Sequence, residues 1–125
     1  MSTLKVDTLK NTSGVEVYTA KAWVNFNGKF ATSPFTEANG GINAAGNVSS
    51  VTDNGTGAYT VNFTTAFADA NYVVVLTNEE TGTEMHNAQT NTGYDQTTSA
   101  AKIRCCISGT GTNYDPDQVH CIFFR

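Results

Sequence analysis

The chain has 125 residues and a formal net charge of −4, and its charged residues make up 14% of the total, against a usual fraction of about 25%. This length fits one domain, and scattered Lys and Arg residues argue against the basic face that nucleic-acid binding requires. No apolar run approaches the length of about 18 residues that a membrane span requires. The N-terminus lacks the apolar segment of a secretory signal, so we expect a protein that is made in the cytoplasm and is not exported by the secretory route.

Two segments near the N-terminus predict strands by their alternation of apolar and polar residues. The first is Leu4–Leu9. The second is Ala22–Asn27, which places Ala22, Val24 and Phe26 on one face. Alternation with a period of two is typical of a strand with one buried face.

The Gly-rich and Asn-rich segment Ala38–Asn47 predicts a flexible loop near the boundary between an arm and the main body. We expect residues 1–28 to form an N-terminal arm and attachment segment. Residues 29–125 then form the body.

A hairpin is predicted where Asn54-Gly55 separates a strand near Asn47–Asp53 from a second strand. Asn-Gly favours a two-residue type I′ turn, in which both residues have positive φ. The second strand is the clearest in the chain, with Tyr59, Val61 and Phe63 on one face. Glu79–Glu84 predicts another hairpin turn.

Two strands have apolar residues on both faces, namely Tyr72–Leu76 and Val119–Phe124. A strand of a β-sandwich needs only one apolar face, so something must cover the second. We expect oligomerisation to cover it, with the interface formed by Val73, Val75, His120, Ile122 and Phe124. The alternative is coverage by the loop that contains Phe30 and Phe35.

Together these patterns predict an all-β protein, an antiparallel β-sandwich with an extended N-terminal arm, assembled as an oligomer. No segment has a sustained helical period.

The best candidate for a metal site in the sequence is a set of four residues: Cys105, Cys106, His120 and Cys121. Neighbouring residues of a strand point to opposite faces, so these pairs favour packing over zinc binding. With three cysteines and no export signal, we expect free thiols rather than disulfides.

Acidic turns offer two further possibilities, which we judge weaker than solvated turns. Glu79, Glu80, Glu84 and His86 lie across the predicted hairpin, where they could bind a cation or act as an acid–base pair. Asn113–Gln118 lacks the Gly and terminal Glu of a calcium loop and favours a turn set by Pro116. No catalytic motif is present. We therefore expect a non-enzymatic protein without a metal or cofactor.

Three stretches carry a family resemblance: "STLKVDTLKNTSG", "KAWVNFNG" and "NVSSVTDNGTGAYTVNFTTAFADANYVV". They resemble fibre-like tail proteins of bacteriophages, especially those of marine and cyanobacterial phages. The pattern "YTVNF…F…ANYVVV" is also similar to the small trimeric sandwich of H-type lectin domains. The likeness covers roughly the first 75 residues.

The resemblance implies a homotrimeric virion structural protein, made in the host cytoplasm, that binds other virion proteins. Leu4, Val6 and Leu9 are the residues we expect to dock on the virion. Two roles are compatible with this class. One is a tail fibre that contacts a host-surface glycan, with Trp23, Tyr94, Tyr114 and Asp115 as candidate contacts. The other is a capsid decoration (cement) protein or a short head fibre.

Overall fold

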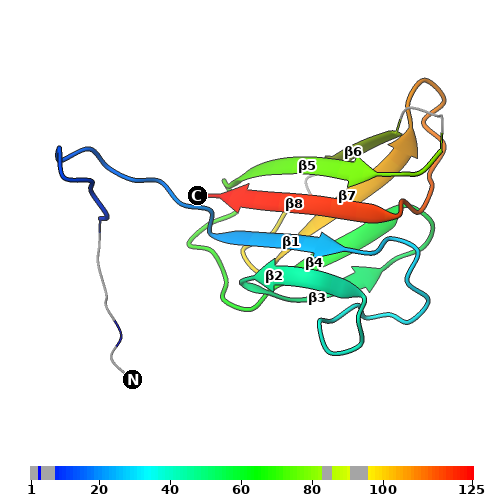
Figure 1. Ribbon diagram of the computed structural model, residues 1–125, viewed down its shortest axis with the longest axis horizontal. Coiled ribbons are helices and arrows are strands. Elements are labelled where there is room, and N and C mark those ends of the chain that lie inside the picture. Colours follow the sequence, from blue (N-terminus) through cyan, green and yellow to red (C-terminus); the bar gives the residue numbers. More distant parts are fainter. Residues whose placement is uncertain (1–2, 4–7, 83–85, 91–95) are drawn as a thin grey trace.

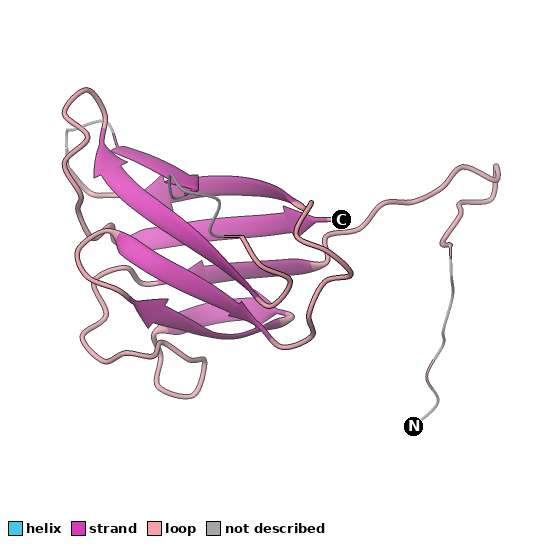
Figure 2. Ribbon diagram, turned by 180° about the vertical axis from the view of Figure 1, so that it is seen from behind, coloured by secondary structure: helices cyan, strands magenta, loops and turns pink. Residues whose placement is uncertain are grey.

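The computed structural model describes residues 3, 8–82, 86–90 and 96–125, and these residues form strands, turns and loops. Two antiparallel sheets stack face to face as a β-sandwich, as Figures 1 and 2 show from opposite sides. The predicted all-β, antiparallel sandwich is confirmed. Within the described ranges, no helix is long and apolar enough to cross a membrane.

The front sheet in Figure 1 has the strand order β2-β1-β8-β5, and the sheet behind it has the order β3-β4-β7-β6. Because the chain changes sheet after β2, β4, β5 and β7, each sheet combines strands from distant parts of the sequence. The strand bounds are β1 (Ala22–Phe26), β2 (Ile42–Gly46), β3 (Val48–Asp53), β4 (Ala58–Phe63), β5 (Val73–Glu79), β6 (His86–Thr90), β7 (Ala100–Ile107) and β8 (Gln118–Phe124).

The structure moves the boundary between the arm and the body. Strand β1 falls inside the range 1–28 assigned to the arm, but it pairs with both β2 and β8 inside a sheet. The expected flexible loop at Ala38–Asn47 is also wrong, because it contains β2. Pairing with β1 turns this Gly-rich segment into a strand despite its weak strand propensity.

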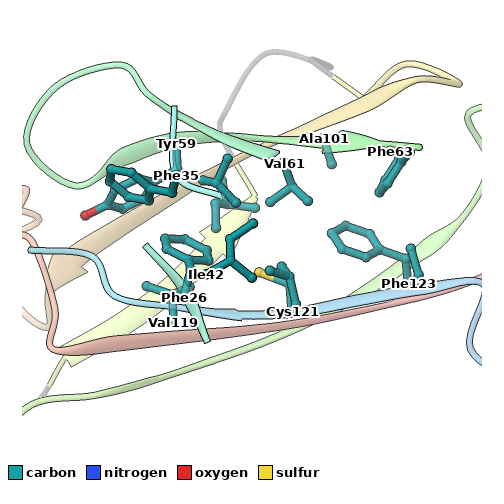
Figure 3. Packing of buried hydrophobic residues seen from close by; sticks show 14 of the residues in the cluster. Phe26, Phe35, Ile42, Tyr59, Val61, Phe63, Ala101, Val119, Cys121 and Phe123 are labelled. Atoms are coloured by element: carbon teal, nitrogen blue, oxygen red, sulfur yellow. The ribbon is translucent and has the colours of Figure 1, made fainter. Parts of the chain in front are cut away.

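The core lies between the two sheets and is rich in aromatic rings (Figure 3). At one end, the ring of Phe26 lies 5.1 Å from that of Tyr59. At the other end, Phe63 packs edge-to-face on Phe123 with 5.0 Å between ring centres. The predicted inward faces of β1 and β4 are therefore confirmed, because their apolar residues line this core.

Both turn predictions need correction. Strands β3 and β4 form the expected hairpin, but a loop over residues 54–57 joins them instead of a two-residue turn. Positive φ angles fall on Gly55 and Gly57, whereas Asn54 is not among the residues with positive φ. The segment after Glu79 does not close a hairpin, because it links β5 to β6 in the opposite sheet.

Gly57, in the loop between β3 and β4, provides a test of how closely the chain packs there. It has a φ of +67°, and a Cβ atom there would lie 2.4 Å from the carbonyl oxygen of Cys105. Gly109 has a similar φ of +89° but open space around it. We expect Gly109→Ala to lower the free energy of unfolding by about 1 kcal/mol through backbone strain alone, and Gly57→Ala to lower it by roughly 3 kcal/mol. Denaturant unfolding measures both, and equal losses would contradict the predicted steric overlap.

Candidate functional site

The side of the β2-β1-β8-β5 sheet that faces away from the core carries an exposed cluster of large apolar side chains. We call this side the outer face. In the strand pairing, Ile122 of β8 lies opposite Trp23 of β1 on one side and opposite Val75 of β5 on the other. Phe124 of β8 lies opposite Val73 of β5. Val73 is 62% exposed and Val75 is 46% exposed. These five residues, Trp23, Val73, Val75, Ile122 and Phe124, form what we call the outer patch.

A polar row borders the outer patch on the same three strands. His120 of β8 aligns with Asn25 of β1 and with Thr77 of β5. The side-chain amide of Asn43 donates to Asn25 Oδ1 at 3.0 Å. His120 is half-buried, and its Nε2 atom has no hydrogen-bond partner among the described residues. Of the five predicted interface residues, four thus belong to the outer patch and His120 lies at its polar border.

The β1–β2 loop does not cover this patch. Phe35 is fully buried in the core, and its backbone N–H donates to the carbonyl of Val51 in β3 at 2.7 Å. Phe30 packs edge-to-face on Phe35 with 5.7 Å between ring centres. The loop therefore closes the core beside β3. The alternative in which Phe30 and Phe35 cover the second apolar face is wrong.

Residues 9–17 of the N-terminal segment form a small hairpin, which we call the arm hairpin. Val17 N–H donates to the carbonyl of Leu9 at 2.6 Å, and Lys10 and Glu16 form an isolated β-bridge. Inside the turn, the side-chain oxygen of Asn11 accepts hydrogen bonds from two backbone N–H groups. Sequence reasoning missed this element, because backbone hydrogen bonds and one asparagine side chain close it, and no apolar pattern marks it.

The arm hairpin leaves its apolar side chains exposed. Tyr18, which follows it, is 79% exposed, and Val15 is 59% exposed. The segment extends away from the sandwich at the end where the C-terminus lies, as both ribbon views show. It joins the body through Lys21, whose N–H donates to the carbonyl of Phe123 at 2.8 Å.

A cavity of about 680 Å³ lies between this N-terminal segment and the body, and we call it the arm cavity. Leu9, Val17 and Tyr18 line one side, and Val73 and Phe124 of the outer patch line the other. Glu16, Lys21 and Arg125 add charge to the lining. The outer patch and the arm cavity therefore form one continuous surface.

An ion pair fixes the C-terminal side of the arm cavity. Arg125 Nη2 lies 2.6 Å from Asp69 Oδ2, and Arg125 Nε donates to Asp69 Oδ1 at 2.8 Å. This two-point contact, with a further hydrogen bond from the N–H of Asn71, holds the pKa of Asp69 at about 2. The C-terminal residue is thereby tied to the β4–β5 loop.

Lys29 joins three loops at the end of the sandwich opposite the arm. Its Nζ lies 2.8 Å from Glu80 Oε1 and 2.7 Å from Asp117 Oδ1. Asp117 Oδ2 also accepts hydrogen bonds from the N–H and the hydroxyl of Thr81, each at 3.1 Å. Within the part of the chain that the structure describes, no group of three or more acidic, His or Cys residues could hold a metal ion.

Two of the candidate ligand contacts belong to a structural hydrogen-bond network. Asp115 Oδ1 accepts from the N–H of Gly57 at 2.7 Å and from the hydroxyl of Tyr59 at 2.8 Å. Burial raises the pKa of Tyr59, and hydrogen bonding to Asp115 raises it further. The side-chain amide of Asn78 donates to the hydroxyl of Tyr114, and burial raises the pKa of that hydroxyl as well.

The remaining candidates divide between exposed positions and positions outside the described residues. Trp23 is 43% exposed in the outer patch, and its indole ring lies against Gly46 of β2. Leu9 is exposed at the start of the arm hairpin. Leu4, Val6, Tyr94 and Glu84 lie outside the described residues, and the side chain of His86 is likewise not described.

The three cysteines are buried and free of disulfides. Cys105 and Cys121 belong to the core cluster. Burial raises the pKa of Cys105 to about 12, and it raises the pKa of Cys121 as well. Thiols with raised pKa values are poor nucleophiles, so packing in the core describes the role of Cys105 and Cys121.

The comparisons with known proteins give one structural likeness. No protein-family model matches the chain, and no curated protein matches its sequence. Among solved structures, the chain is similar to the phiAB6 tailspike, crystallised in complex with three-repeated oligosaccharides of Acinetobacter baumannii surface polysaccharide. The sequence identity is 14% and the TM-score is 0.49, over 99% of this chain and 30% of the tailspike chain. The chain therefore spans less than a third of the length of that protein.

The pKa of Asp69 gives a pH-dependent prediction. Its folded value of about 2 lies below the unfolded value of about 3.9. The contribution of ionised Asp69 to the stability of the fold is therefore complete at pH values well above its unfolded pKa. It is lost as the pH falls through its folded pKa. We expect Asp69→Asn to have a lower Tm than the native chain at about pH 6, with the gap closing between about pH 5 and about pH 2.

Thermal unfolding followed by circular dichroism over this pH range measures the gap. Arg125→Gln serves as the matched variant, because it removes the partner of Asp69 and should show the same convergence. A gap that stays constant down to about pH 2 would contradict a stabilising role for this ion pair.

Proposed function

We propose that the protein is a non-enzymatic virion structural module of a bacteriophage that assembles as a homotrimer through its outer patch. The observation that carries the proposal is the outer patch itself. It places five large apolar side chains on one sheet face, and no described part of the chain covers it. Apolar surface of this kind typically marks an interface.

The opposite side of the sandwich supports this assignment by contrast. On the outward side of the β3-β4 pair, the side-chain amide of Asn62 donates to Ser50 Oγ at 3.1 Å and to Thr52 Oγ1 at 3.0 Å. Asn54 similarly donates to Thr60 Oγ1 at 2.8 Å. That surface is polar and its side chains bond to one another, so it suits contact with water. The outward side of the β3-β4 pair therefore differs in polarity from the outer patch.

The resemblance of the first 75 or so residues to fibre-like phage tail proteins supports the virion assignment. In the tail-fibre role, the N-terminal segment docks on other virion proteins through Leu4, Val6 and Leu9, and the body faces outward. The alternative role is a capsid decoration protein or a short head fibre. Both roles use the same trimer, so the position of the chain in the particle distinguishes them.

Contact with a host-surface glycan is the finer part of the proposal. Trp23 lies in the outer patch, where the proposed trimer would bury it, so a glycan would bind elsewhere. A cavity of about 610 Å³ near Tyr114 is lined by polar side chains that suit sugar hydroxyls. They are Asn78, Glu79, Glu80, Thr81, Asp117 and Gln118. This loop end lies opposite the N-terminal segment, and so faces outward in a docked trimer.

A charge at the centre of the outer patch tests the assembly. We expect sedimentation of the native protein to give a mass of about 40 kDa, three times the chain mass of 13.3 kDa. Ile122→Asp should sediment at the mass of one chain, because an unpaired carboxylate would have to enter an apolar interface. The side chain of Ile122 points out of the core and is 38% exposed, so the variant should still fold.

Ser49→Asp is the control, since Ser49 is exposed on the opposite sheet. It should remain trimeric. Trp23 is the only tryptophan of the chain, so its fluorescence should shift to longer wavelength in Ile122→Asp and remain unchanged in Ser49→Asp. A native chain that sediments as a monomer would refute the trimer, and a trimeric Ile122→Asp would refute the location of its interface.

Deleting residues 1–20 tests the docking role of the N-terminal segment. The deletion leaves every strand intact, so we expect a folded body that no longer joins the particle. Antibody labelling of purified particles measures incorporation. Labels on the tail of native particles support the fibre role, and labels over the head support the decoration role. A truncated chain that still incorporates would contradict docking through this segment.

A further inference from the structure

The cavity of about 610 Å³ near Tyr114, which we call the loop cavity, is lined by six polar residues. Three of them carry carboxylates: Glu79, Glu80 and Asp117. An ionised carboxylate accepts hydrogen bonds but donates none. The balance of donors and acceptors in this lining therefore decides which groups a ligand must bring.

Two side-chain donors of the lining are already used within the chain. The hydroxyl of Thr81 donates to Asp117 Oδ2 at 3.1 Å. The side-chain amide of Asn78 donates to the hydroxyl of Tyr114, which lies outside the lining. Gln118, the sixth lining residue, has an amide that accepts as well as donates. The lining therefore offers a ligand more acceptors than donors.

Glu80 shows this shortage of donors within the chain itself. Its Oε1 atom accepts from Lys29 Nζ at 2.8 Å, and the same ammonium donates to Asp117 Oδ1 at 2.7 Å. The Oε2 atom of Glu80 is buried and has no hydrogen-bond partner among the described residues. A buried acceptor without a donor costs free energy. One shared ammonium therefore does not meet the needs of both carboxylates.

The same residues give the loop cavity a negative charge. Its three carboxylates are offset by one ammonium, that of Lys29, which leaves a net charge of −2. Glu79 is exposed, so its charge acts directly on a ligand that enters the cavity. Like charges repel one another, and the repulsion grows as water is displaced from between them. An anionic ligand would therefore meet repulsion and few free donors.

We propose that the loop cavity selects glycans by charge: it binds neutral or amine-bearing sugars and excludes sugars that carry a carboxylate, sulfate or phosphate group. This inference rests on the proposed glycan contact and names the class of glycan. Sugar hydroxyls bring the donors that the carboxylates of the lining accept, and a sugar ammonium adds attraction to the net negative charge. An acidic group on a sugar brings a further acceptor and a like charge.

A glycan array tests this selection with the native protein. The array carries neutral, amine-bearing and acidic oligosaccharides, including pairs that differ only in one carboxylate or sulfate group. We expect the strongest signals from neutral and amine-bearing glycans, with the acidic member of each bound pair weaker by about fivefold or more. Acidic glycans among the strongest signals, or equal signals within the pairs, would overturn the inference.

A reversal of charge in the lining provides a second measurement. Glu79→Lys changes the net charge of the lining from −2 to 0, and it should raise the signal of acidic glycans relative to their neutral partners by about fivefold. Glu16→Lys is the matched control, because it makes the same change at an exposed position of the arm hairpin, at the opposite end of the molecule. It should alter that ratio by less than about twofold.

Both positions are exposed, so we expect the two variants to fold, and circular dichroism checks that they do. Equal effects of the two substitutions would show that the charge of the whole chain decides, and would contradict selection by the loop cavity.

The array also separates this inference from the proposed function. Binding that prefers acidic glycans would keep the glycan contact and overturn only the selection by charge. A protein that sediments as a trimer but binds no glycan on the array would remove the glycan contact from the proposed function, and this inference with it.

Discussion

Strand β8 imposes the constraint on which the rest of the structure depends, because it carries apolar side chains on both faces. Val119, Cys121 and Phe123 face inward and are fully or almost fully buried in the core. Ile122 and Phe124 face outward, where Trp23 of β1 and two valines of β5 extend them into the outer patch. The inner face stabilises the sandwich of one chain. The outer face is the surface that the proposed trimer buries, because burying apolar area is the main favourable contribution to both folding and association.

The abundance of Thr, Asn and Ser follows from the opposite requirement on the other sheet. Outward residues of β3 and β4 bond to one another through Asn62, so these polar groups find partners within the chain. At the far end of the sandwich, Lys29 ties loops that lie 51 and 88 residues away in the sequence. These contacts are internal to one chain and do not depend on assembly. The low charge of the chain is therefore compatible with a well-defined body.

Sequence alone predicted the elements whose two faces differ, such as the strand that contains Tyr59, Val61 and Phe63. It failed at β2, because Asn43–Gly46 has no apolar period and becomes a strand only by pairing with β1. The outer patch could be predicted in part, since Tyr72–Leu76 and Val119–Phe124 carry apolar residues on both faces. Its fifth member, Trp23, could not be assigned to it, because only the register of β1 against β8 places Trp23 beside Ile122. The arm cavity is lined by residues from both ends of the sequence. A local sequence pattern cannot predict that such distant residues lie close together.

The division between body and N-terminal segment implies an order of events in the proposed assembly. The body closes its own core and loops, so it can fold before any second copy arrives. The arm hairpin and the residue that follows it leave Val15 and Tyr18 exposed and add no side chain to the core of the body. Its turn is already closed by Asn11, which lowers the ordering cost that a flexible segment would incur on binding. In the proposed assembly, folding and association therefore use opposite faces of one strand: the inward face of β8 belongs to the core, and its outward face belongs to the outer patch.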